Sequence, residues 1–161
     1  MSELSVDSLA AIDHEIAKYP KGKQASAVMS ALRIAQKERG WLAKETIEFV
    51  ANYLSIPAIR AYEVATFYNM YDLKPTGKRK LCLCTNLPCA LMGAMKTAKA
   101  LKEALGVDFG QTTEDNEWTL KEGECFGACG DAPVIIVNNE KMHEKITAEK
   151  VLVFLESLKR N

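Results

Sequence analysis

The chain has 161 residues, of which 48% are hydrophobic, and it carries 21 basic and 21 acidic residues. A chain of this length can bury a core sufficient for one domain or for two small packed domains. The balanced charge argues against a nucleic-acid or membrane-surface binder, because either would need a basic face.

The sequence also carries no targeting signal that we can identify. It has no run of about 18 apolar residues, so it predicts no membrane span. The N-terminal stretch MSELSVDSLAAIDHE is acidic and lacks the basic and apolar regions of a signal peptide. Five cysteines in such a chain favour a reducing compartment, where thiolates bind metal more often than they form disulfides. We therefore expect a soluble cytoplasmic protein.

Apolar residues recur at helical spacing through the first part of the chain, and we expect residues 1–75 to form a helical bundle domain. The pattern predicts helices over residues 8–19, 24–38 and 44–54, with Asp7 or Ser8 capping the first and Pro20 stopping it. Pro57 suits a first helical position, so a further helix is expected to run from there into the segment YEVATFYNMY.

Pro75-Thr76-Gly77 marks a change in the sequence pattern, and residues 76–161 are expected to form a second domain. The expected elements are a strand at 80–84, a helix at 90–105, a strand at 118–120, a hairpin at 134–143 turning at Asn138-Asn139, and a last helix capped by Thr147. This is the element order of a thioredoxin-like α/β core. The predicted fold class is therefore α+β, with a helical bundle followed by a thioredoxin-like domain.

Four of the five cysteines form two close pairs in this second domain. Four residues separate Cys84 from Cys89, three separate Cys125 from Cys129, and thirty-five lie between the pairs. If the first two strands are parallel neighbours, the pairs lie in loops at one edge of the sheet, where α/β proteins usually place their sites. The pairs therefore predict a four-thiolate metal site that only folding can close.

The spacing favours a two-iron, two-sulfide cluster over zinc. Structural zinc is most often held by C-x2-C knuckles, whereas both intervals here are wider, and each iron of a binuclear cluster takes a pair of thiolates. Gly127 and Gly130 could bring backbone N–H groups close to the sulfides. A zinc-stabilised interaction module, structural disulfides and free thiols stay open as alternatives. A thiol–disulfide oxidoreductase is less favoured because the chain has no C-x-x-C motif.

Several residues around the pairs have two possible roles. Cys82, two residues before Cys84, could compete as a ligand, but we expect it to be a buried core cysteine. Phe126 could shield the cluster or simply pack in the core. His14 and His143 are expected on a helix and a strand and not as ligands. Acids near the second pair should lower a cluster's reduction potential unless water screens them; they are Glu114, Asp115, Glu117, Glu122, Glu124 and Asp131.

A family resemblance rests on four segments taken together. They are YPKGKQASAVMSALRIAQKERGWL, YEVATFYNMY, CTNLPCALMGA and ECFGACGDAPVIIVNN. On these motifs the chain resembles the thioredoxin-like ferredoxin subunit of the NADH-oxidising module of respiratory complex I, an NADH:quinone oxidoreductase. It is also similar to counterparts in NAD-linked hydrogenases and formate dehydrogenases.

The resemblance implies one [2Fe–2S] cluster held by Cys84, Cys89, Cys125 and Cys129, in a subunit that transfers electrons but has no catalytic residues of its own. FMN and NADH would be bound only by a flavin-bearing partner, which agrees with the lack of a G-x-G-x-x-G fingerprint in this sequence. Other peripheral-arm subunits are further implied partners. The resemblance also implies a place on the cytoplasmic side of the inner membrane. The segment YEVATFYNMY with the preceding helices is the expected docking face, and internal packing of Tyr62, Phe67 and Tyr71 stays open as an equal alternative.

Overall fold

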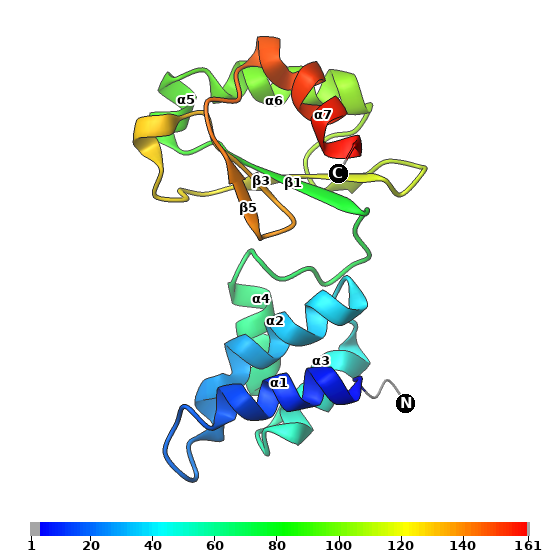
Figure 1. The fold of residues 1–161 in the computed structure, drawn as a ribbon, viewed down its shortest axis with the longest axis vertical. Coiled ribbons are helices and arrows are strands. Elements are labelled where there is room, and N and C mark those ends of the chain that lie inside the picture. Colours follow the sequence, from blue (N-terminus) through cyan, green and yellow to red (C-terminus); the bar gives the residue numbers. More distant parts are fainter. Residues whose placement is uncertain (1–3, 161) are drawn as a thin grey trace. The chain divides into compact units, whose positions relative to one another are not determined.

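The computed structural model describes residues 4–160, and the chain divides into two compact units, one ending at Pro75 and one beginning at Thr76 (Figure 1). Within the described range no helix combines the length and the apolar character that a bilayer crossing requires.

The first unit is a bundle of helices around one apolar core. Its elements are α1 (Val6–Ile16), η1 (Gln24–Ala27), α2 (Val28–Arg39), α3 (Lys44–Tyr53) and α4 (Ala58–Phe67). Apolar side chains at helical spacing, such as Ile12, Leu32 and Ile47, are fully buried between these helices. The predicted helical bundle is confirmed, because the 3.6-residue period places these side chains on facing stripes.

Helix boundaries in this unit differ from the predicted ones by a few residues. Ser5, and not Asp7 or Ser8, is the N-cap of α1, where its Oγ accepts a hydrogen bond of 3.2 Å from the Ser8 N–H. Pro57 is the N-cap of α4 and not its first helical residue, since its ψ of 137° is extended. The first shift reflects the choice between Ser5, Asp7 and Ser8, which are all favoured N-cap types, and the second is a one-residue difference in where the helix begins.

Within residues 76–160 the second unit builds a five-stranded mixed sheet in the order β2-β3-β1-β4-β5. The strands are β1 (Arg79–Cys84), β2 (Gln111–Thr112), β3 (Trp118–Gly123), β4 (Ile135–Val137) and β5 (Lys141–His143). β1 runs parallel to β3, and the other neighbouring strands are antiparallel. The predicted parallel contact between the first strand and the strand before Cys125 is therefore confirmed.

Helices cover one face of this sheet. α6 (Ala94–Leu105) and α7 (Val151–Lys159) lie on the same side of it (Figure 1). Their apolar residues, such as Leu101 of α6, share a core with alternate residues of the strands, such as Leu83 of β1 and Leu120 of β3. A helical unit followed by an α/β unit is the predicted α+β class, which is confirmed.

Three details of this unit differ from the prediction. The helix expected over 90–105 is two helices, α5 (Leu87–Leu91) and α6, because Gly93 adopts the left-handed region at φ 94° and interrupts the run. β2 was not predicted. Thr147 precedes a short turn, η3 (Ala148–Lys150), and makes no side-chain cap bond there. The turn at Asn138 and Asn139 is as expected, with φ values of 53° and 58°.

Candidate metal centre

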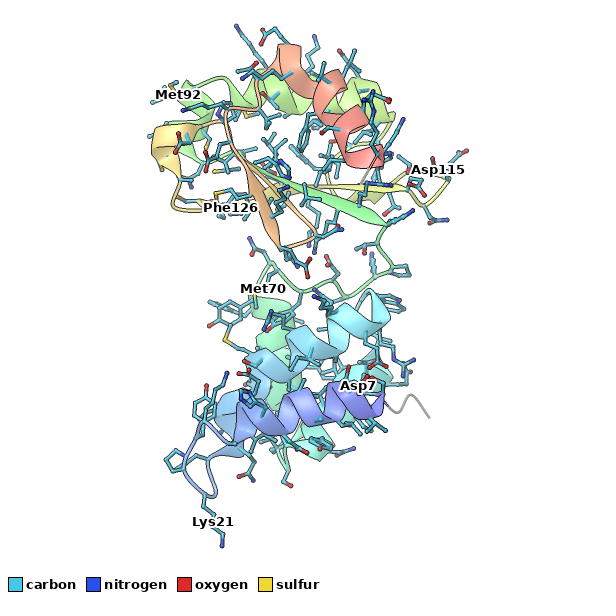
Figure 2. The ribbon with its side chains drawn as sticks, viewed as in Figure 1. Asp7, Lys21, Met70, Met92, Asp115 and Phe126 are labelled. Atoms are coloured by element: carbon cyan, nitrogen blue, oxygen red, sulfur yellow. The ribbon has the colours of Figure 1, made fainter. Side chains whose placement is uncertain are left out.

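Both thiol pairs lie where β1 and β3 end. In the parallel register Cys84, the last residue of β1, is opposite Gly123, the last residue of β3. Cys89 follows in α5, Cys125 comes two residues after Gly123, and Cys129 begins the turn η2 (Cys129–Asp131). The structure therefore brings all four predicted ligands to one end of the sheet, the end marked by Phe126 and Met92 in Figure 2; Asp115 marks the opposite end.

The first pair is buried. Cys84 and Cys89 are each 2% exposed and lie in an apolar pocket with Ala94, Ala132 and Val134. Burial disfavours a thiolate, and together with a hydrogen bond to Cys84 it raises the pKa of Cys89 to about 11. Metal ions that bind thiolates would have to displace a proton from this group.

The second pair is exposed and held by a tight loop. The Sγ atoms of Cys125 and Cys129 are 3.8 Å apart, and the hydrogen bond between them raises the pKa of Cys129. The Gly127 N–H donates a hydrogen bond of 3.4 Å to the Cys125 Sγ. Gly127 reaches that position at φ 77°, a conformation that residues with a Cβ seldom adopt. This glycine thus points a backbone donor at the sulfur of a predicted ligand, an arrangement that suits a negatively charged centre.

The two pairs influence each other electrostatically. Negative charge on Cys129 also raises the pKa of Cys89, and Cys84 raises that of Cys129. Across residues 4–160 no three or more His, Cys, Asp or Glu side chains gather tightly enough to hold one metal ion. The thiols are arranged instead as two pairs facing a shared region. That donor set fits a binuclear iron–sulfur cluster, in which each iron takes two thiolates.

Phe126 and Cys82 both pack over Gly123. A Cβ built on Gly123 would lie 2.5 Å from the Phe126 Cζ and 2.7 Å from the Cys82 Sγ. Cys82 is buried in the sheet. The Phe126 ring therefore anchors the Cys125–Cys129 loop to the end of β3, in a space that exists only because residue 123 has no side chain. Phe126 also packs against the apolar cluster that contains Cys84 and Cys89, so the structure places its side chain next to the predicted ligands.

The histidines lie on the elements expected for them. His14 is in α1, and His143 is in β5, where its ring makes an edge contact with Phe154.

Of the six acids near the second pair in sequence, Glu122 and Glu124 bond to the first ligand loop. Glu122 accepts a hydrogen bond from the Thr85 Oγ1 at 2.7 Å, and Glu124 accepts one from the Asn86 Nδ2 at 2.9 Å. Two of the other acids form ion pairs elsewhere, Glu117 with Arg79 and Asp131 with Lys145. Asp115 lies at the far end of the sheet (Figure 2). Thr85 and Asn86 were not predicted, because nothing in their spacing signals a contact across 37 or 38 residues.

Comparison with known proteins adds to this geometry. The family model described as "Thioredoxin-like [2Fe-2S] ferredoxin" matches residues 12–159. A subunit of the NADH-quinone oxidoreductase of Rickettsia bellii is 43% identical over 147 residues, covering 91% of this chain and 87% of that protein. The mitochondrial NADH dehydrogenase [ubiquinone] flavoprotein 2 of Dictyostelium discoideum is 35% identical over 99% of this chain and 64% of that protein.

Among solved structures, an NAD+-reducing [NiFe]-hydrogenase in the H2-reduced state superposes with a TM-score of 0.71 over 85% of this chain, at 18% identity. This chain spans 23% of the length of that hydrogenase chain. At this identity the likeness shows a shared fold.

The packing over Gly123 can be tested by filling the space. Gly123→Ala should lower the free energy of unfolding by about 1–3 kcal/mol, because the new methyl group forces Phe126 or the Cys82 side chain to move. Urea denaturation followed by circular dichroism measures the change. Gly130→Ala is the matched control, since no atom lies within 4 Å of a Cβ there. Equal stability of the two variants would contradict the packing described.

Proposed function

The chain belongs to the thioredoxin-like [2Fe–2S] ferredoxin family, and from this membership we propose that it is the iron–sulfur electron-carrier subunit of an NADH:quinone oxidoreductase, complex I. The resemblance carried by the sequence motifs is thereby confirmed at the level of the family. The relative from the NADH-quinone oxidoreductase of Rickettsia bellii supports the complex, since identity of 43% extends over most of both chains. The likeness to an NAD+-reducing hydrogenase gives weaker support for the alternative, a subunit of an NAD-linked hydrogenase, because it rests on the fold alone.

Cys84, Cys89, Cys125 and Cys129 are the proposed ligands of one [2Fe–2S] cluster. The observation that carries this assignment is the convergence of two thiol pairs, one buried and one exposed, at the ends of parallel strands. When bound there, such a cluster supplies a centre that takes up or releases one electron at a time. The buried pair would fix it to the protein interior, and the exposed pair would hold its outer side towards a partner.

The partner we propose is a flavin-bearing, NADH-binding subunit of the same complex. Oxidation of NADH releases two electrons together as a hydride, so a flavin on the partner has to separate them before this chain can receive one. Exposed apolar side chains from α5 to the start of α6, next to the first ligand loop, support a protein partner at this end; they are Leu87, Leu91, Met92 and Met95. We further propose contacts with other peripheral-arm subunits, on the cytoplasmic side of the inner membrane.

The ligand assignment predicts metal content and its loss. The chain purified without oxygen should contain about two irons and two acid-labile sulfides, the composition of one binuclear cluster. Alanine at Cys84, Cys89, Cys125 or Cys129 should abolish the stable cluster, because each iron needs both thiolates of its pair. Iron and sulfide assays with a visible spectrum and electron paramagnetic resonance on reduction measure this. Cys82→Ala is the control and should keep the cluster; zinc without sulfide in the parent chain would favour an interaction module.

Charge near the exposed pair predicts a low reduction potential. Glu124 directly precedes Cys125, and negative charge close to the centre disfavours an added electron. Glu122→Gln together with Glu124→Gln should raise the midpoint by an amount on the order of tens of millivolts. Potentiometric titration monitored by paramagnetic resonance measures it. An unchanged midpoint would mean that water screens both carboxylates.

The docking face predicted around YEVATFYNMY divides into packed and exposed residues. Tyr71 is 4% exposed and donates a hydrogen bond of 2.8 Å to the Met29 carbonyl oxygen, whereas Phe67 is 79% exposed and meets the Tyr68 ring edge-on. Tyr62 packs against the core of the bundle. Phe67 and Tyr68 are thus the aromatic side chains of this segment that are available to a partner.

Aspartate at both Phe67 and Tyr68 should weaken binding to the flavoprotein at least about tenfold, since buried aromatic contacts dominate protein interfaces. Co-purification of the two proteins, followed by titration of the separated components, measures this. Val6→Asp is the control, because Val6 is an equally exposed apolar residue on α1. Undiminished binding by the double variant would exclude this face from the interface.

A further inference from the structure

The backbone contact between the two ligand-bearing loops ends just beyond the strands. Cys84 and Gly123 are the last paired residues of β1 and β3, and the Thr85 N–H donates a final hydrogen bond of 3.1 Å to the Gly123 carbonyl oxygen. Past this point each chain segment leaves the sheet, one towards Cys89 and the other towards Cys125. Main-chain pairing alone therefore does not set the separation of the two loops.

Two side-chain hydrogen bonds continue the connection. The Thr85 Oγ1 donates to the Glu122 Oε1 at 2.7 Å, and the Asn86 Nδ2 donates to the Glu124 Oε2 at 2.9 Å. The two donors are the two residues after Cys84. The two acceptors lie three residues and one residue before Cys125. The Asn86–Glu124 bond thus lies beyond the last backbone pair and joins one ligand loop to the other, and the Thr85–Glu122 bond ties the first ligand loop to the end of β3.

The orientation of Asn86 shows that this is not ordinary helix capping. Asn86 is the N-cap of α5, a position where an asparagine side chain usually accepts from a backbone N–H of the first turn, but it makes no such cap bond. Its amide donates instead to Glu124 across the gap. An ionised carboxylate is a stronger hydrogen-bond acceptor than a neutral oxygen.

We propose that Thr85–Glu122 and Asn86–Glu124 form a clamp that holds the two ligand loops at the spacing a shared cluster needs, and that it controls how long the chain retains that cluster. This inference rests on the function proposed above. A centre held by two loops is lost when the loops move apart, because the thiolates of one pair then leave together. Glu122 and Glu124 are positioning residues in this role, and they act through the loops and not as ligands.

The test measures cluster release from the full-length loaded chain. With excess iron chelator and no oxygen, Thr85→Val and Glu122→Ala should each speed the decay of visible absorbance about two- to fivefold, because this hydrogen bond is exposed to solvent and contributes less than a buried one. The double variant should be no faster than either single variant, because both remove the same bond. Asn86→Ala and Glu124→Ala should behave as a second such pair. Glu114→Ala removes an acid at the β2–β3 turn and should leave the rate unchanged.

A second measurement follows the clamp directly. Hydrogen exchange of the full chain as purified, resolved by mass spectrometry, should be faster around Thr85 and Gly123 in Glu122→Ala than in Glu114→Ala. Unchanged release in Thr85→Val, unchanged exchange in Glu122→Ala, or release rates that multiply in the double variant would each overturn the clamp while leaving the ligand assignment intact. A parent chain without iron and sulfide would overturn the proposed function and the clamp's part in retention together.

Discussion

The parallel pairing of β1 with β3 is the constraint on which the rest of this structure depends. A parallel register delivers the carboxyl ends of both strands to the same edge of the sheet, so Cys84 and Gly123 finish side by side. The loops that follow carry the two thiol pairs into one region although thirty-five residues separate them in sequence. The apolar core under α6 and α7 stabilises that register.

The sequence predicted the elements whose signal is local or periodic. The helical stripes of the first unit, the strand before Cys84 and the Asn138-Asn139 turn follow from spacing and residue type, and so did the grouping of the cysteines in pairs. The break at Gly93 was missed because one glycine within an apolar-periodic run resembles a tolerated substitution. β2 was missed because two residues are too few to show an alternating pattern.

Features that depend on the path of a loop could not be predicted in this way. The burial of Cys84 and Cys89 against the exposure of Cys125 and Cys129 arises from how each loop leaves the sheet, and residue type does not encode it. The same holds for the Phe126 ring over Gly123 and for the bonds from Thr85 and Asn86. The bonds from Thr85 and Asn86 join residues 37 or 38 positions apart and have no period, so no local pattern announces them.

The unequal burial of the thiol pairs also bears on how the proposed cluster would be assembled. With the proposed ligands, iron and sulfide donors would meet the exposed Cys125 and Cys129 directly from solvent, while Cys84 and Cys89 are buried among apolar side chains. A flavoprotein seated over this end would close the entrance. The chain should therefore take up the iron and sulfide of the proposed cluster as a free protein, before it joins a larger complex.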